Sequence, residues 1–197
     1  MPSNANPRLV LFSRYPEPGK AKTRMIPTLG PDGAAALHKK LAERTLTTLR
    51  KTDLPIELRY TGAPESRFRQ WLGDDIAYAE QGEGDLGDRM ARASQPAPVI
   101  FLGSDCPDLH PRHIAEAAQA LISSNVVIGP AEDGGYWLLG LAKRFDYLFE
   151  DMPWGTDQIL PITLSRLAAR GIAPAMLETL ADCDRPEDLT RWPELTA

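Results

Sequence analysis

Two short runs of consecutive apolar residues, 9–12 and 99–102, constrain the fold of this chain most strongly. Neither run alternates with polar residues, so each is expected to be a strand buried on both faces, which is typical of parallel sheets. Strand patterns also occur at 55–60, 76–79, 126–128, 136–141 and 173–177, and helix patterns at 31–51, 64–72, 88–94, 111–123, 158–170 and within 182–195. The alternation predicts an α/β fold with a mostly parallel, Rossmann-like sheet flanked by helices on both faces.

Length and charge narrow the function classes. The 197 residues are expected to form a single domain, 1–197. A net charge of −5 argues against general nucleic-acid binding, which needs a basic face. No apolar run approaches the roughly 18 residues of a membrane span, and the first residues do not resemble a signal peptide. The chain is therefore expected to be cytoplasmic, with Cys106 and Cys183 as free thiols.

The first apolar run opens into a loop that is rich in cations. Two prolines and Gly19 exclude a helix there, and four cations follow within eleven residues: Arg14, Lys20, Lys22 and Arg24. An α/β sheet binds ligands at the carboxyl ends of its strands, and Lys and Arg suit phosphate oxygens. The loop is therefore expected to bind phosphates, with a solvated basic loop as the alternative. It is neither a Walker A loop nor a G-x-G-x-x-G loop.

Acidic residues follow the second apolar run and recur near the end of the chain. Asp105 and Asp108 come directly after residues 99–102, and Asp184 lies in the run 182–189. Carboxylates together with substrate phosphates are the usual ligands of Mg²⁺. Asp108 and Asp184 could each instead cap a following helix, and the sequence leaves both readings open. A zinc site is not favoured, because the spacing of cysteine and histidine does not fit one.

The loop 129–135 is a third candidate site. Glu132 and Asp133 precede Gly134 and Gly135, so acids that could bind sugar hydroxyls or act as a base stand beside glycines that permit close approach. A hairpin-like turn is the alternative. Trp154 could stack on a sugar or a base. No histidine is paired with a nucleophile and no G-x-S-x-G is present, so a serine hydrolase is not supported.

Taken together, these segments resemble the nucleotide-diphospho-sugar transferase superfamily, which has the GT-A fold, over nearly the whole chain. Residues 12–24 resemble its first-strand phosphate loop, and 103–107 its metal-binding strand end. Gln81 with 84–87 resembles the base-reading segment of nucleotidyltransferases. Residues 184–189 resemble the D-T-P-E-D-L run of CMP-sugar synthetases, with Arg185 in place of Thr. The chain looks closest to bacterial GT-A-like transferases of the arsenosugar-biosynthesis type, which are related to molybdenum-cofactor and 2-phospholactate guanylyltransferases.

The resemblance implies a transferase that depends on Mg²⁺ or Mn²⁺ and takes a nucleotide-activated donor and a small-molecule acceptor. A glycosyltransferase that uses an NDP-sugar is the leading expectation. The alternative is a nucleotidyltransferase that releases pyrophosphate from an NTP, and the third is a nucleotide-binding regulator without activity. The first loop is longer and richer in proline than the compact glycine-rich loop of nucleotidyltransferases, which makes an NDP-sugar donor at least as plausible as a triphosphate.

The expected site residues follow from these segments. The expected catalytic residues are Lys22, Arg24, Asp105 and Asp133. Those expected to bind the nucleotide are Phe12, Arg14, Gly19, Lys20, Lys22, Arg24, Gln81, Gly84, Asp85, Leu86, Gly87, Ser104 and Asp105. Those expected to contact the acceptor or sugar are Glu132, Asp133, Gly134, Gly135, Tyr136 and Trp154. Asp105 and Asp184 are expected to lie close enough to share one metal ion, since strand ends of a parallel sheet meet at one edge.

Overall fold

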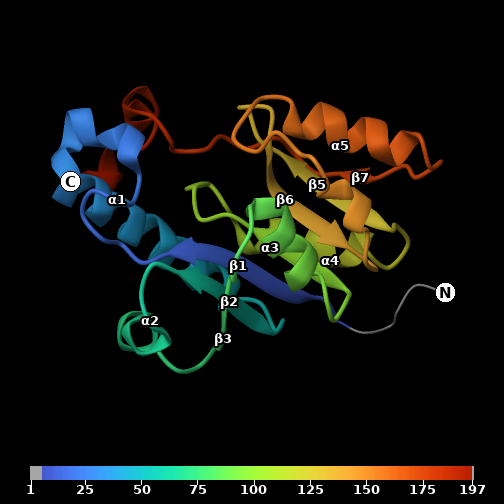
Figure 1. Ribbon diagram of the computed structural model, residues 1–197, viewed down its shortest axis with the longest axis horizontal. Coiled ribbons are helices and arrows are strands. Elements are labelled where there is room, and N and C mark those ends of the chain that lie inside the picture. Colours follow the sequence, from blue (N-terminus) through green and yellow to red (C-terminus); the bar gives the residue numbers. More distant parts are fainter. Residues whose placement is uncertain (1–5, 197) are drawn as a thin grey trace.

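The computed structural model describes residues 6–196, in which seven strands form one sheet with the order β3-β2-β1-β4-β6-β5-β7 (Figure 1). The strands are β1 Arg8–Arg14, β2 Ile56–Thr61, β3 Ala77–Glu80, β4 Val99–Leu102, β5 Val126–Pro130, β6 Tyr136–Leu141 and β7 Ala175–Met176. Neighbouring strands are parallel except at β6, which is antiparallel to both β4 and β5. The predicted α/β class with a mostly parallel sheet is confirmed.

Five α-helices and four short 3₁₀ helices connect the described strands. They are α1 Ile26–Leu49, α2 Glu65–Leu72, α3 Leu86–Ala93, α4 Pro111–Ala120 and α5 Ile159–Ala168, with 3₁₀ turns at Thr23–Met25, Asp146–Leu148, Pro186–Thr190 and Pro193–Leu195. Helix α1 is interrupted at Gly30, whose φ of 68° and ψ of 171° are not helical. Its longer part therefore begins at Pro31, where the sequence predicts a helix to begin, and residues 26–29 add a further turn before the interruption.

The two central strands are buried on both faces, as predicted. In β1, Leu9 and Leu11 pack into one hydrophobic cluster with α1, α2 and α4, while Val10 packs into another with α3 and α5. The same alternation holds in β4, where Ile100 and Phe101 face opposite clusters. Burial of each such side chain stabilises the fold by about 1.5–3 kcal/mol. The loops that leave β1 and β4 are therefore anchored on strands whose central residues are buried.

The antiparallel strand β6 brings extra residues to the edge where β1, β4 and β5 end. Only five residues, 131–135, join β5 to β6, which suits a hairpin and is too short for a parallel crossover. Tyr136 at the start of β6 therefore lies at the carboxyl edge of the parallel strands. The end of the chain returns to the same edge, because Leu180 bridges Ala131 and the amide of Cys183 donates to the carbonyl of Asp105. Within residues 6–196, no helix is long and apolar enough to cross a membrane.

Candidate active site at the carboxyl edge of the sheet

A buried ammonium group joins three segments that are far apart in the sequence. Lys22 Nζ lies 2.7 Å from Asp105 Oδ1 and 2.6 Å from Asp184 Oδ1, and it donates to the carbonyl oxygen of Cys183 at 2.8 Å. These three acceptors satisfy the three N–H groups of an ammonium. We refer to Lys22, Asp105 and Asp184 as the Lys22 cluster. The cluster ties the phosphate-loop candidate to the end of β4 and to the C-terminal segment.

The backbone is shaped to place Lys22 there. Lys22 has φ 46° and ψ 47°, a left-handed conformation that is uncommon for a residue with a side chain, and the 3₁₀ turn Thr23–Met25 follows at once. Such conformations persist where the surroundings determine them. Met25 is fully buried in a cluster with α1 and the C-terminal segment, which anchors the end of the loop. The side chain of Lys22 is only 6% exposed.

Charge pairing controls the ionisation of the cluster. Burial alone would lower the pKa of Lys22, but the two carboxylates outweigh it and hold that pKa above its ordinary value. Burial likewise acts to raise the pKa of Asp105, and the adjacent Lys22 ammonium reverses this and holds it below its usual range. Lys22 therefore stays charged and Asp105 stays ionised at neutral pH.

The structure excludes the cap interpretation for both acidic residues that precede helix starts. Asp184 is not a helix cap, because its carboxylate contacts Lys22 while Asp188 accepts from the amides of Asp184 and Arg185. Asp108 does not cap α4 either. Its Oδ1 accepts from Trp192 Nε1 at 3.0 Å, and His110 is the residue at the cap position.

The donor set of the Lys22 cluster fits a hard divalent cation. Both carboxylates lie within 2.7 Å of one nitrogen, so their oxygens are close enough for a single ion to touch both, as the sequence predicted. One or two carboxylates plus substrate phosphates are the usual ligands of Mg²⁺, and oxygen ligands also suit Mn²⁺. Within residues 6–196, no group of three or more acidic, histidine or cysteine side chains is arranged for a metal. The remaining ligands would have to come from substrate and water.

A cationic hollow of about 310 Å³ lies on one side of the Lys22 cluster. Its lining residues are Arg14, Lys20, Ala21, Lys22, Thr23, Arg24, His38, Asp105 and Asp184. Arg24 approaches Asp184 to 3.9 Å, whereas the exposed Lys20 pairs with Glu17 at 3.1 Å. The predicted phosphate-loop cations therefore do converge on one hollow.

His38 was not among the expected site residues, yet it lines the cationic hollow. Burial lowers its pKa, and its Nε2 donates to the carbonyl of Arg14 at 2.9 Å. This bond ties α1 to the end of β1 below the loop. The signal in the sequence was its spacing, because His38 stands four residues after Ala34 on the buried stripe of α1.

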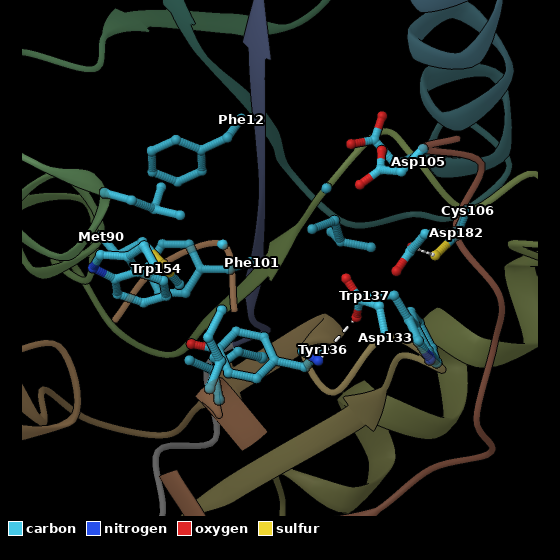
Figure 2. Close-up of a pocket in the computed structure, with 18 residues that line it drawn as sticks. Phe12, Met90, Phe101, Asp105, Cys106, Asp133, Tyr136, Trp137, Trp154 and Asp182 are labelled. Carbon is cyan, nitrogen blue, oxygen red and sulfur yellow. Dashed lines mark hydrogen bonds between the residues drawn. The ribbon is translucent and has the colours of Figure 1, made fainter. Parts of the chain in front are cut away.

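A second pocket of about 240 Å³ lies on the other side of the Lys22 cluster (Figure 2). One wall is apolar and largely aromatic: Phe12, Met90, Phe101, Tyr136 and Trp154. The opposite wall carries four carboxylates: Asp105, Asp133, Asp182 and Asp184. We refer to this space as the two-walled pocket. Sequence analysis expected six of these nine residues at the site and did not include Met90, Phe101 and Asp182.

Asp182 is the most notable residue that sequence analysis left out. It accepts a hydrogen bond from the Cys106 thiol at 2.6 Å, as the dashed line in Figure 2 marks. Burial, together with the negative charges of Asp133 and Asp105, raises the pKa of Asp182 to about 7. Each cysteine has an aspartate beside it in the sequence. Cys106, however, bonds to Asp182, the neighbour of Cys183, and so links the end of β4 to the C-terminal segment. Both cysteines are buried free thiols, as expected.

The loop around Asp133 is fixed by glycines. Gly134 has φ +87°, and a side chain there would meet the backbone of Asp157 at 2.5 Å, so the position requires glycine. Asp133 Oδ1 accepts from the amide of Gly135 at 2.9 Å, which orients the carboxylate at the rim of the two-walled pocket. Glu132 does not line this pocket and pairs instead with Arg191 at 2.8 Å.

Gln81 does not present a free amide, contrary to the expectation for a base-reading residue. Its Nε2 donates to the carbonyls of Ser13 and Arg59, and its Oε1 accepts from Arg89. The Gln81 side chain is buried, and these hydrogen bonds join β1, β2 and α3.

The expected base-reading segment after Gln81 is mostly exposed and locally bonded. Asp85 caps α3 in a reciprocal pair with Asp88, and Gly87 packs against the carbonyl of Phe149, where a side chain would not fit. Of the segment 84–87, Leu86 lines the two-walled pocket. Of the two remaining expected residues, Ser104 is buried with its hydroxyl 3.4 Å from Asp105 Oδ1, and Gly19 sits in the exposed part of the first loop.

Comparison with known proteins identifies a family. Residues 45–156 match the model of a family described as uncharacterized proteins conserved in bacteria, DUF2064. The chain belongs to this family. The matched region of this DUF2064 protein contains Asp105, Asp133 and the apolar wall except Phe12, whereas Phe12, Lys22 and Asp184 lie outside it. At the level of sequence, no curated protein matches the chain.

Solved structures show the same fold. A protein from Desulfovibrio desulfuricans G20, provisionally named a nucleotide-diphospho-sugar transferase, is 28% identical, with a TM-score of 0.87 over 95% of this chain and 87% of that one. A nucleotidyl transferase from Methanothermobacter is 18% identical, with a TM-score of 0.67 over 98% of both chains. Glucosyl-3-phosphoglycerate synthase from Mycobacterium tuberculosis, solved with Mn²⁺ and UDP, is 12% identical, with a TM-score of 0.57 over 98% of this chain and 76% of that one.

These similarities confirm the predicted resemblance of this DUF2064 protein to the nucleotide-diphospho-sugar transferase superfamily. The Desulfovibrio protein is named as a nucleotide-diphospho-sugar transferase and the Methanothermobacter protein as a nucleotidyl transferase, which agrees with the prediction of a transferase enzyme. Together with the shared fold, these similarities support a transferase that uses a nucleotide, without distinguishing glycosyl transfer from nucleotidyl transfer.

Proposed function

We propose that this protein is a transferase that depends on a divalent metal and transfers a sugar from an NDP-sugar to a small-molecule acceptor. One observation carries the proposal: a lysine from a cationic loop contacts two carboxylates between a cationic hollow and a two-walled pocket. Phosphates, metal and the group to be transferred thus have adjacent places along one edge of the sheet, where α/β folds bind ligands.

The donor diphosphate would occupy the cationic hollow. Arg14, Lys20 and Arg24 supply N–H donors there, with Arg suited to bidentate contact with phosphate oxygens. Asp105 and Asp184 would hold Mg²⁺ or Mn²⁺, which supplies positive charge against the charge that develops on the leaving diphosphate. Preorganised charge at that position is the largest single contribution in many transferases. The exposed segment 84–86 is proposed to contact the base, with Gln81 holding the strands beneath it.

The sugar and the acceptor would occupy the two-walled pocket. Tyr136 and Trp154 offer flat apolar surfaces, and the facing carboxylates can accept hydrogen bonds from hydroxyl groups. Asp133 is proposed as the base that takes the proton from the acceptor hydroxyl, because its carboxylate is oriented by Gly135 and stands at the rim of the pocket.

Nucleotidyl transfer is the second candidate. It is favoured by the nucleotidyl transferase that matches this chain over 98% of both lengths. In that reaction a phosphorylated acceptor attacks an NTP, and the same cationic hollow would take the triphosphate.

Product analysis separates the two reactions. The protein is incubated with a panel of NDP-sugars and NTPs, an acceptor mixture, and Mg²⁺ or Mn²⁺. Release of NDP with loss of the sugar supports glycosyl transfer, and release of pyrophosphate supports nucleotidyl transfer. The Asp105→Asn variant, prepared in parallel, controls for contaminating enzymes. Nucleotide binding without either product would contradict both and favour a regulator without activity.

A further inference from the structure

We propose that Lys22 and the divalent ion compete for one cation position between Asp105 and Asp184. When the ion displaces Lys22, the ammonium group pairs with a phosphate of the donor instead. This inference rests on the proposed function. It makes Lys22 a positioning residue that couples metal binding to donor binding.

The contacts of Lys22 are the first support. The ammonium touches the same carboxylate oxygens that the metal would use, at 2.7 and 2.6 Å. Its third hydrogen is taken by the carbonyl of Cys183, and the side chain is 6% exposed. An ammonium in this place cannot contact a phosphate at the same time, since its three donors are already used.

Charge is the second support. A divalent ion bound to Asp105 and Asp184 would stand beside the buried Lys22 ammonium, and like charges at contact distance repel. One of the two cations must therefore move. Within the described residues, no group of three or more carboxylate, histidine or cysteine side chains offers the metal a fuller ligand set elsewhere. Lys22 borders a hollow into which its side chain can move, so Lys22 is the cation that moves.

The place to which Lys22 would move is the third support. Lys22 lines the cationic hollow together with Arg14, Lys20 and Arg24, so its side chain already borders the space proposed for the donor diphosphate. Leaving the carboxylates would also release the restraint on its left-handed backbone conformation. With metal alone, the displaced ammonium gains no partner, whereas with phosphate it does.

This arrangement predicts positive coupling. Metal alone binds weakly because it must displace Lys22, and a phosphate-bearing donor strengthens metal binding by the same factor by which metal strengthens donor binding. The enzyme would thereby bind metal firmly only when the donor is present.

Metal affinity without nucleotide tests the exchange directly. Mn²⁺ binding is measured by the electron paramagnetic resonance signal of the free ion for wild type, Lys22→Met and Lys39→Met. Lys39 is an exposed residue of α1, so its variant has the same net charge as Lys22→Met without touching the cluster. We expect Lys22→Met to bind Mn²⁺ at least about tenfold more tightly than wild type, and Lys39→Met to bind like wild type. Equal or weaker binding by a folded Lys22→Met variant overturns the exchange.

A measurement on wild type keeps the inference testable if Lys22→Met does not fold. Lysines are labelled with an amine-reactive reagent and read by peptide mass. We expect Mn²⁺ alone to increase labelling at Lys22 while leaving Lys39 unchanged, and added inorganic pyrophosphate to reduce Lys22 labelling again. Unchanged or reduced labelling of Lys22 on adding Mn²⁺ alone would overturn the exchange.

A third variant separates this inference from the proposed function. Asp184→Asn should weaken Mn²⁺ binding by at least about tenfold, since it removes a carboxylate ligand. If Asp184→Asn binds Mn²⁺ as well as wild type does, the metal site itself is wrong. If it loses binding but Lys22→Met gains none, the metal site stands and only the exchange is wrong.

Discussion

Two pairs of carboxylates on one wall of the two-walled pocket differ in what surrounds them. Asp105 and Asp184 share a buried ammonium, and the pKa of Asp105 lies below its usual range. Asp133 and Asp182 have no ion pair in the part of the chain that the structure describes, and burial raises the pKa of Asp182 to about 7. The pKa of Asp105 is thus lowered and that of Asp182 is raised within one pocket. The two differ because the neighbouring ammonium outweighs the effect of burial at Asp105, whereas Asp182 has no such cation beside it within residues 6–196.

This difference separates two kinds of chemistry. Asp105 stays ionised at neutral pH and, together with Asp184, contacts the Lys22 ammonium. Asp182 can carry a proton near neutral pH and could then donate a hydrogen bond as well as accept one. A half that is ion-paired with Lys22 and a half whose carboxyl group can be protonated therefore lie side by side in the pocket.

The largest expected effect comes from neutralising the paired carboxylates. Asp105→Asn and Asp184→Asn should each lower metal-dependent turnover by about a hundredfold or more, because each removes a charge that is proposed to hold the metal at the reacting phosphate. Turnover is measured at saturating Mn²⁺, with Asp53→Asn, an exposed position between α1 and β2, as the matched control. Turnover within a few-fold of wild type in both site variants would show that the paired carboxylates do not act in the reaction.

The paired carboxylates also show how far the sequence alone can lead. The apolar runs of β1 and β4 predicted two central strands, and the ends of strands in a parallel sheet predicted that Asp105 and Asp184 would lie close together. The contact of Lys22 with both carboxylates was not predicted. Asp184 was left open between ligand and cap because a cap depends on backbone angles that residue identity does not determine. The contact with Lys22 excludes the cap, and it requires the C-terminal segment to pass beside β4, which only the folded chain reveals.

The unpaired carboxylate Asp182 could not be predicted, for a physical reason. Its pKa depends on burial beside Cys106 and on the proximity of Asp133, and both depend on the antiparallel placement of β6 and on the return of residues 180–184 to the sheet. Gln81 illustrates the opposite case, since a motif resemblance suggested base recognition while the fold uses its amide to join three elements. Local pattern predicts elements and edges well, but it does not predict which polar groups are already paired.

A smaller effect should come from Asp182. The pKa of this carboxyl rises from about 3.8 in the unfolded chain to about 7 in the folded one, so the folded protein holds a proton that the unfolded chain releases. The free energy of unfolding should therefore fall as pH rises from about 4 to about 7. Asp182→Asn should remove this decline and raise stability at pH 7 by about 1–3 kcal/mol, given about 1.4 kcal/mol per pKa unit and partial solvent contact.

Urea unfolding of wild type and Asp182→Asn at a series of pH values from 4 to 8 measures this effect. The amide oxygen of Asn can still accept from the Cys106 thiol, so the variant changes charge more than packing. Parallel pH profiles for the two proteins would show that Asp182 is not the titrating group and would weaken the contrast between the paired and unpaired carboxylates.

Cys106 offers a way to sharpen that contrast. The thiol donates to Asp182 at 2.6 Å, and this bond favours the ionised carboxylate, so Cys106→Ala should raise the pKa of Asp182 further. The decline in stability should then extend to higher pH than in wild type. The same urea series measures it, with the double variant Cys106→Ala, Asp182→Asn as control, in which the shift should vanish. A shift that persists in the double variant would assign the effect to packing around the lost thiol.

The smallest effect is expected at the exposed cation Lys20, which tests whether burial gives Lys22 its special role. Lys20 stands in the same loop and lines the same hollow, but its side chain is 58% exposed and pairs with Glu17 instead of an aspartate of the cluster. Water screens an exposed charge, so its contribution to binding is small. Lys20→Met should therefore weaken donor affinity only a few-fold, change stability by no more than about 0.5 kcal/mol, and leave Mn²⁺ affinity unaltered. Calorimetric titration of donor and of Mn²⁺ measures both. A gain in Mn²⁺ affinity for Lys20→Met as large as that expected for Lys22→Met would mean that general loop charge, and not occupancy of the position between Asp105 and Asp184, governs metal binding.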